Sequence, residues 1–191
     1  MLSVIVATHE SEHALVPTLS ALVPGAMSGL VTEVVVADAG SKDATAEVAD
    51  IAGCRFIASD APLGERLKAA ALSTRTPWLM FLRAGIVLDA DWTGASETFM
   101  QAASFADSAP RAAVFRATAT TSAQPGLGDV IALARAVFTG RKPSPDQGLI
   151  ISRALYEAVG GHPAQAEAEA RLLAQLGRKV AQLGAGARRV A

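Results

Sequence analysis

Short apolar runs alternate with stretches of helical pattern along the first half of the chain. In one run, Val34, Val35 and Val36 are β-branched and follow one another without a polar break, as expected of a parallel strand that is covered on both faces. Strands that alternate with helices in this rhythm form βαβ units and a parallel sheet. The expected strands are residues 2–7, 33–38, 55–58 and 78–82, and the expected helices are residues 17–23, 44–52 and 62–73.

Prolines bound the first expected helix. Pro17 fits the first turn of a short helix, and Pro24-Gly25 is expected to end it. Residues 9–13 before it are expected to form a polar loop.

The second half of the chain is less regular. It shows no repeat, no long linker and no domain boundary, so residues 1–191 are expected to form a single domain. The expected strands are residues 112–118, 149–151 and 180–183, and the expected helices are residues 91–103, 128–138, 153–159 and 164–176.

Small polar residues follow the strand that contains the three valines. The apolar run ends at Asp38, Gly40 allows a tight turn, and Ser41 or Asp43 is placed to cap the next helix. Ligands bind outside the carboxyl ends of strands in open α/β sheets. Two interpretations are therefore open: a ligand site, or a strand-to-helix turn that only needs a glycine and a cap.

Composition limits the classes of partner. The chain has 191 residues, 51% of them apolar, which is enough for one α/β domain with a sizeable core. The net charge of −1 provides no basic surface for nucleic acid. Cys54 is the only cysteine, which excludes an intrachain disulfide and a cysteine metal cluster. No apolar run reaches the ~18 residues that span a bilayer, and no leader-like pattern is present, so a cytoplasmic location is expected.

Four segments, in order and spacing, resemble the inverting family 2 glycosyltransferases of the GT-A fold, and specifically a short bacterial subgroup. They are residues 3–10, 38–45 (Asp38-Ala-Gly40-Ser41-Lys-Asp43-Ala-Thr45), 78–82 and 146–161. The resemblance extends over residues 2–189. It implies a mostly parallel central sheet flanked by helices, with a nucleotide-binding half (1–90) and an acceptor half (91–191). The implied partner is a nucleotide-diphosphate sugar.

The resemblance also implies which residues contact the nucleotide. In the family, the loop after the first strand carries backbone and acidic contacts to the base, and the acid at the end of the second strand binds the nucleoside. The matching positions, with two cations that are candidates for the phosphates, are Ala7, Thr8, Glu10, Asp38, Gly40, Ser41, Lys68 and Arg83.

Two positions depart from the family pattern. An acid that holds a divalent ion, Mg²⁺ or Mn²⁺, is expected where Gly85 stands, and neither Gly85 nor Arg83 supplies a side-chain oxygen for a hard cation. Arg83 offers another route, because a guanidinium neutralises phosphate without metal. Restoring a carboxylate by Gly85→Asp is expected to create metal dependence. Lys68, where the family often has Asn, either faces the diphosphate or lies on the solvated face of its helix.

The acceptor side is expected around Asp146-Gln147, which matches an Asp-Gln pair of the subgroup. Asp146 is the expected general base that deprotonates an acceptor hydroxyl. Larger relatives use an acid pair on the following helix, and that pair registers on residues 165–166, where no acid stands. The segment Gly186-Ala-Arg188-Arg189 matches a basic ending that either pairs with the diphosphate or frays.

The expected function is transfer of a sugar from a nucleotide-diphosphate donor to an acceptor, with inversion. The alternative is a catalytically degenerate GT-A protein that binds a nucleotide or a protein partner without transfer. The apolar helix expected at residues 128–138, flanked by Arg141 and Lys142, has two interpretations. It either packs on the sheet, or contacts a second copy or the inner face of an anionic membrane.

Overall fold

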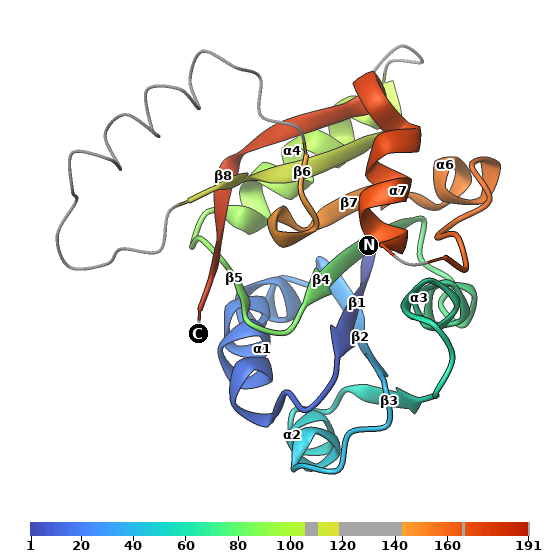
Figure 1. Ribbon diagram of the computed structural model, residues 1–191. Helices are drawn as coiled ribbons and strands as arrows, with labels where there is room; N and C mark the ends of the chain where they lie inside the picture. Colours follow the sequence, from blue (N-terminus) through green and yellow to red (C-terminus); the bar gives the residue numbers. More distant parts are fainter. Residues whose placement is uncertain (106–110, 119–142, 166, 191) are drawn as a thin grey trace, which may run out of the picture.

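The computed structural model describes residues 1–105, 111–118, 143–165 and 167–190, and these contain an eight-stranded sheet with helices on both faces (Figure 1). The strand order is β3-β2-β1-β4-β7-β6-β8-β5. The strands are β1 (Leu2–Thr8), β2 (Val31–Asp38), β3 (Arg55–Ala58), β4 (Trp78–Arg83), β5 (Ile86–Leu88), β6 (Ala112–Ala117), β7 (Leu149–Ser152) and β8 (Val180–Arg189). The α-helices are α1 (Glu12–Met27), α2 (Thr45–Ile51), α3 (Leu63–Leu72), α4 (Trp92–Phe105), α6 (Arg153–Ala158) and α7 (Ala168–Leu176).

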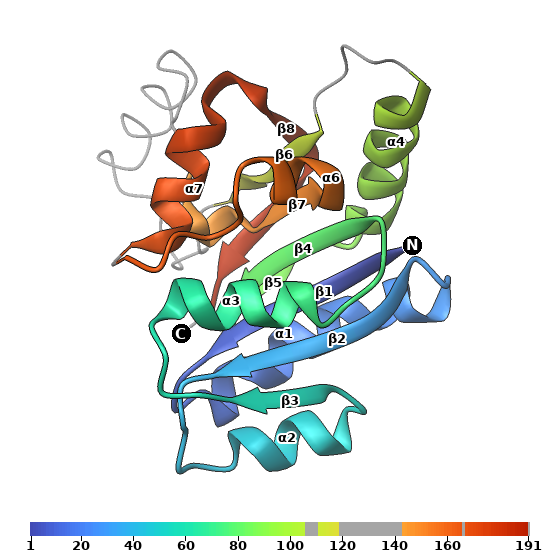
Figure 2. The same ribbon diagram turned by 90° about the vertical axis from the view of Figure 1, so that its right-hand side faces the viewer.

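The first four strands form the parallel βαβ arrangement that the apolar runs predicted. β1 pairs in parallel with β2 and β4, and β2 pairs in parallel with β3. Figure 2 shows β1, β2 and β4 side by side. The register aligns Thr8 with Asp38 and Ala7 with Arg83, so the polar strand ends meet at one edge of the sheet.

Alternate residues of each strand enter two separate cores, because successive side chains point to opposite faces. Val4 and Val6 pack with α1, α2 and α4, whereas Ile5 packs with α3, α6 and α7. In Figure 1, α1 and α3 accordingly lie on opposite sides of the sheet. Coverage on both faces explains why runs such as residues 34–36 in β2 and 79–82 in β4 are apolar without a break.

The second half extends the same sheet in mixed directions. β7 is antiparallel to β4 and β6, β8 is parallel to β6, and the short β5 is antiparallel to β8. Sequence analysis did not predict β5, and it ended the last strand at residue 183, whereas β8 continues to Arg189. Gly184 and Gly186 interrupt the apolar pattern, and Gly186 is needed because a Cβ there would lie 2.3 Å from Asp89 Oδ2.

Helix α1 differs most from the prediction. It begins at Glu12, inside the expected polar loop, and includes both Pro17 and Pro24. Each proline removes a donor to the carbonyl four residues earlier, and these carbonyls belong to His13 and Ser20, which are exposed and therefore accessible to water. Gly25 is not the end of the helix but a packing position: a Cβ there would lie 2.5 Å from the Trp92 ring.

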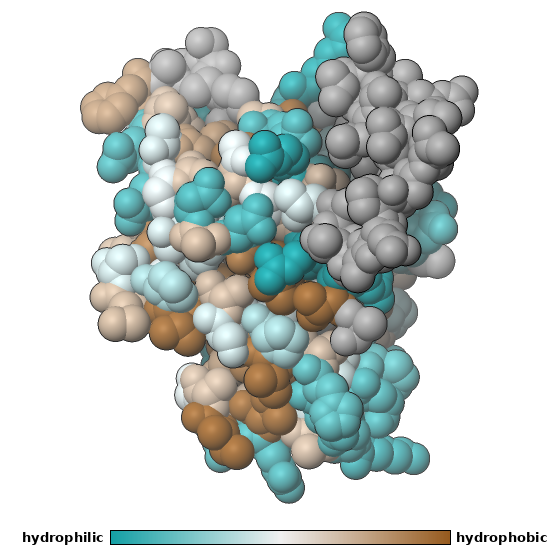
Figure 3. All heavy atoms as spheres, turned by 90° about the vertical axis from the view of Figure 1, so that its left-hand side faces the viewer, coloured by the Kyte–Doolittle hydropathy of each residue, from teal (hydrophilic) through white to brown (hydrophobic). Residues whose placement is uncertain are grey.

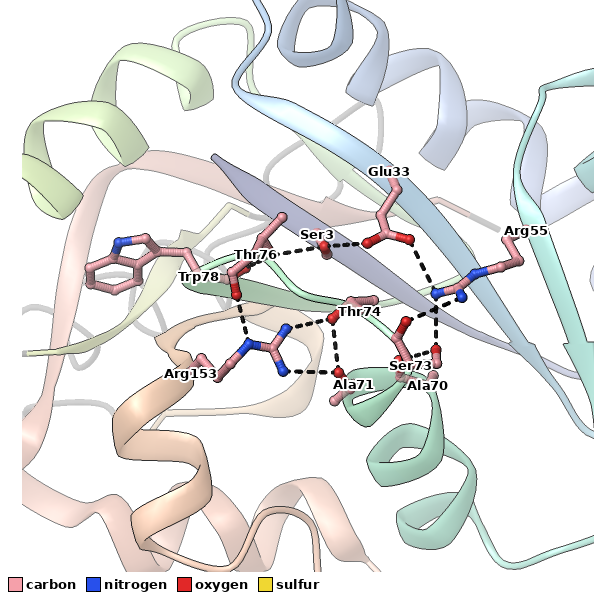
Figure 4. Close-up of polar contacts among 10 residues, drawn as sticks. All are labelled: Ser3, Glu33, Arg55, Ala70, Ala71, Ser73, Thr74, Thr76, Trp78 and Arg153. Carbon is pink, nitrogen blue, oxygen red and sulfur yellow. Dashed lines mark hydrogen bonds and ion pairs between the residues drawn. The ribbon is translucent and has the colours of Figure 1, made fainter.

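A polar network ties both halves together at the amino ends of the parallel strands (Figure 4). Arg153, at the start of α6, donates from Nε to the Thr76 carbonyl (2.7 Å) and from Nη2 to Thr74 Oγ1 (2.7 Å). Its Nη1 donates to the Ala71 carbonyl (3.1 Å) near the end of α3. Thr76 in turn donates to Ser3 of β1 (2.7 Å). This network fixes α3, and with it the residues that α3 carries toward the opposite edge of the sheet.

The helix expected at residues 128–138, for which packing on the sheet and a membrane or dimer contact were both open, lies outside the described residues. Among the helices that are described, none is long and apolar enough to cross a membrane.

Candidate functional site

Asp38 is at the centre of the first part of the site, and it is completely buried. Its Oδ1 accepts hydrogen bonds from Thr8 Oγ1 (2.7 Å) and Ser41 Oγ (2.6 Å), and its Oδ2 accepts one from the Ser41 backbone N–H (2.7 Å). Burial raises the pKa of Asp38, but the bonds from Ser41 and Thr8 outweigh it and hold the pKa below its usual value. The carboxylate therefore holds the turn after β2 in place. A side chain that lined an open crevice would project into solvent, and that of Asp38 does not.

The loops after β1 and β2 are fastened to each other. Glu10 has a positive φ of 47°, donates its backbone N–H to Ser41 Oγ (2.8 Å), and accepts from the Lys42 backbone N–H (2.9 Å) through Oε1. Gly40 has φ +79°, and a Cβ there would lie 3.0 Å from Asp60 Oδ1. Thr8, Glu10, Gly40 and Ser41 thus shape one rigid edge, on which the Ala7 carbonyl also accepts from the Ala84 N–H (3.1 Å).

Arg66 belongs to this edge, although it was not among the predicted contacts. From α3, its Nη1 donates to the Ala37 carbonyl (2.6 Å). Burial lowers the pKa of Arg66, and the charge of Asp38 opposes that shift. Lys68 is exposed and stands two residues further along α3, which is about 200° around the helix from Arg66. That placement favours the solvated-face interpretation of Lys68.

Arg83, at the end of β4, is at the centre of the second part of the site. Its Nε donates to Glu169 Oε2 (2.8 Å), and its Nη2 forms an ion pair with the same oxygen. Its Nη1 lies 3.7 Å from Asp146 Oδ1. Burial lowers the pKa of Arg83, but the bond and charge of Glu169, with a smaller effect of Asp146, raise it above its usual value. Residues from both halves of the chain therefore converge on Arg83.

The two arginines near the end of β8 lie on opposite faces of the strand, as neighbouring strand residues do. Arg189 Nη1 is 3.4 Å from Asp146 Oδ1, the oxygen that Arg83 also approaches. Arg188 Nη1 is 3.4 Å from Asp89 Oδ1 and lines a groove between α1 and β5. Figure 3 faces the side where α1 and β5 lie, and hydrophobic side chains are visible there among polar ones. Only Arg189 of this pair reaches the site.

Sequence analysis missed Glu169 because it registered the family's acid pair on residues 165–166. The helix was expected from residue 164, but α7 begins at Ala168, which puts Glu169 in its first turn. There the side chain is 8% exposed and faces Arg83. An acid therefore stands near the start of this helix, a few residues after the position where the family's pair was sought.

Gln147 does not face an open acceptor side. Its side chain is buried, with Nε2 donating to the Phe115 carbonyl (2.7 Å) and Oε1 accepting from the Ser144 N–H (2.8 Å). Together with Ser144, it forms a capping box around the short 3-10 helix Pro145–Gln147, which carries Asp146. The amide of Gln147 holds Asp146 in place.

Gln147→Leu should therefore lower the free energy of unfolding by about 1–3 kcal/mol, because the Phe115 carbonyl and the Ser144 N–H lose their buried partner. Urea denaturation measures the effect. The control is Gln101→Leu on the exposed surface of α4, where a change within about 0.5 kcal/mol is expected. Equal effects of the two substitutions would contradict the positioning role of Gln147.

The residues around Gly85 do not fit a divalent metal. Gly85 is buried with φ +88°, and a Cβ there would lie 3.2 Å from the Val190 carbonyl oxygen. The Gly85 carbonyl accepts from the Val190 N–H (2.8 Å), so the chain after β8 covers the position where the family has its acid. In the described part of the chain, no group of three or more His, Cys, Asp or Glu side chains is arranged to hold a metal. Gly85→Asp would strain this contact, so it is a poor way to restore a site.

Comparison with known proteins identifies the family of the chain. The sequence profile of glycosyl transferase family 2 matches residues 3–118, more than half of the chain. A search of curated proteins found no match.

Solved structures share the fold over nearly the whole chain. TarS 1–349 of S. aureus in complex with UDP has a TM-score of 0.74 at 15% identity, covering 100% of this chain and 60% of TarS 1–349. Glucosyl-3-phosphoglycerate synthase from Mycobacterium tuberculosis, with Mn²⁺, UDP and glucosyl-3-phosphoglycerate, has a TM-score of 0.61 at 18% identity, covering 95% and 68%.

The mannosyltransferase PcManGT from Pyrobaculum calidifontis, with GDP-mannose and Mn²⁺, has a TM-score of 0.68 at 16% identity, covering 95% of this chain and 54% of its own. At such identities the likeness shows the fold, and the family profile shows the relationship. The chain has the GT-A fold and belongs to glycosyl transferase family 2.

Proposed function

We propose that the protein is an inverting glycosyltransferase that uses a nucleotide-diphosphate sugar. The observation that carries the proposal is the meeting of Arg83, from the nucleotide-binding half, with Asp146 and Glu169, from the acceptor half, at the carboxyl edge of the parallel strands. In the proposed reaction, Arg83 is the cation for the leaving phosphate, and Asp146 beside it is the carboxylate for the acceptor hydroxyl. Family membership supports the same reaction class.

The proposed roles follow from the positions of the side chains. Residues 1–90 hold the nucleotide, with the edge built by Asp38, Thr8 and Ser41 shaping its pocket. Residues 91–191 present the acceptor. Asp146, whose side chain is 46% exposed, takes the proton of the acceptor hydroxyl. The acceptor oxygen then bonds to the anomeric carbon from the side opposite the donor phosphate. The bond from that carbon to the phosphate oxygen breaks, and the nucleoside diphosphate leaves with the electron pair.

A second candidate function is nucleotide or partner binding without transfer. The observation that favours it is the environment of Gly85, where the carboxylate that the family uses for metal is replaced by a buried glycine. Both candidates predict nucleotide binding at the same edge, and only the first predicts a broken sugar–phosphate bond.

Nucleotide release from a panel of donors separates the two. The panel includes UDP- and GDP-linked sugars, because structures of fold relatives contain UDP, UDP-GlcNAc or GDP-mannose. Slow release of nucleoside diphosphate from at least one donor, measured by a coupled nucleotide assay, is the expected result, and a suitable acceptor should accelerate it. Binding of a nucleoside diphosphate without any release, across the panel and a set of sugar, lipid and glycerate acceptors, would favour the second candidate.

A further inference from the structure

The place of the expected metal ligand is closed by backbone. The Gly85 N–H donates to the Ala14 carbonyl (2.9 Å) and to Thr18 Oγ1 (2.9 Å), and its carbonyl accepts from Val190. No side-chain oxygen projects from this strand end, and hard cations require oxygen ligands. A leaving diphosphate still needs positive charge near the bond that breaks. Among the described residues, arginine side chains at this edge can supply that charge.

Two guanidinium groups stand at this edge. Arg83 reaches it from β4 and Arg189 from β8, and both approach Oδ1 of Asp146, at 3.7 Å and 3.4 Å. In the sheet, β7 and β6 lie between β4 and β8. The two arginines therefore reach Asp146 from opposite sides of these two strands. Two guanidiniums that share one carboxylate oxygen have the spacing to share an oxygen of a phosphate group.

Glu169 orients Arg83 without using up its donors. The carboxylate takes the Nε–H and one N–H of Nη2, so it does not engage Nη1, the nitrogen that lies 3.7 Å from Asp146 Oδ1. The Nη1–Asp146 separation of 3.7 Å is longer than a hydrogen bond, so this contact is easily exchanged for a stronger acceptor. Glu169 is buried and therefore remains a fixed support for the guanidinium.

We infer that Arg83 and Arg189 form the diphosphate subsite of this protein and replace the divalent cation, with Glu169 positioning Arg83. The inference rests on the proposed function, because it assigns the part of the donor that the two arginines hold. Asp146 lies between the same two guanidiniums and competes with the diphosphate for them. Removing its charge should therefore tighten nucleotide binding while it removes the base for transfer.

Calorimetric titration with UDP, GDP, CDP, dTDP and ADP, in excess EDTA and again in Mn²⁺, tests the inference. The tightest ligand should bind with affinities that agree within about twofold in the two buffers. Arg83→Ala and Arg189→Ala should each weaken binding roughly tenfold or more, the effect of losing charge-assisted hydrogen bonds. Arg83→Lys keeps the positive charge but loses the paired N–H donors of the guanidinium, so its affinity should lie between those of wild type and Arg83→Ala.

The matched control is Arg188→Ala, which removes the same side chain from the other face of β8 and should leave the affinity unchanged. Asp146→Asn should bind more tightly than wild type. Thermal melts of each variant verify folding. Arg189→Ala is the variant least expected to disturb the fold, because the Arg189 side chain is 62% exposed.

The outcomes separate the inference from the proposed function. Binding that requires Mn²⁺ and is insensitive to Arg83 and Arg189 would overturn the inference and leave the proposed function standing. Equal losses in the Arg188 and Arg189 variants would also overturn it, because the effect would then be one of general charge. Failure of every nucleoside diphosphate to bind in either buffer would overturn both.

Discussion

Asp146→Asn is expected to lower the rate of sugar transfer by roughly 10²–10⁴-fold, the usual contribution of a general base. The amide is nearly the same size but cannot accept the acceptor's proton, so chemistry is lost while the fold is kept. Asp146 is the half-exposed carboxylate of the cluster, whereas Glu169 is buried and held on Arg83. Single-turnover assays with saturating donor measure the chemical step without interference from tighter nucleotide binding.

The matched control for this substitution is Asp50→Asn, an exposed acid on α2 far from the cluster, for which an unchanged rate is expected. Glu169→Gln should weaken donor binding through Arg83 more than it slows the bound complex. The assignment of the base would move to Glu169 if its substitution abolished transfer at saturating donor while Asp146→Asn remained active.

Asp38→Ala is expected to lower the free energy of unfolding by about 3 kcal/mol. The substitution leaves Thr8 Oγ1 and the Ser41 N–H and hydroxyl without their buried acceptor. Arg66 also loses the charge that offsets its burial. Urea denaturation followed by circular dichroism measures the loss, and Asp50→Ala on the surface of α2 is the control. Equal unfolding midpoints for the two variants would show that Asp38 lines an open pocket, as its position after an apolar run first indicated.

The contribution of Asp38 to stability should depend on pH in one direction. Its pKa is lowered in the folded protein from the usual value of 3.8, so the folded state binds the proton less readily than the unfolded state. The contribution is therefore fully present at neutral pH and is lost as the pH falls below about 5 toward the folded pKa. The stability difference between wild type and Asp38→Asn should be constant from neutral pH down to that range and shrink below it.

The parallel half of the fold was predictable because local sequence decides it. Runs such as Val34 to Val36 are apolar on both faces, and β3 was placed at its observed bounds. Helix α1 was misjudged because Pro17 was taken as a first-turn residue and Pro24 as the end of the helix. Both lie inside α1, where the exposure of His13 and Ser20 allows them to be tolerated. Exposure of a particular helix face is a tertiary property, and no local pattern reports it.

The candidate site was predictable where it lies at strand ends and unpredictable where it depends on distant pairs. Thr8, Asp38 and Arg83 end neighbouring strands, and that spacing placed them together correctly. The contact between Arg189 and Asp146 joins residues 43 positions apart. The neighbouring Arg188 faces away from the site and pairs with Asp89. Which of two adjacent arginines enters the site depends on the register of β8, which two glycines obscure in the sequence.

Hydrogen–deuterium exchange, measured with and without the tightest-binding nucleoside diphosphate, tests the central claim that the carboxyl edge of the parallel strands is the nucleotide site. Slower exchange is expected in peptides that cover Glu10, Ser41 and Gly85, and in the loop that carries Asp146. The network around Arg153 at the opposite edge should exchange as before. Protection confined to peptides around Thr74 and Arg153, with no change after β1, β2 and β4, would contradict the account.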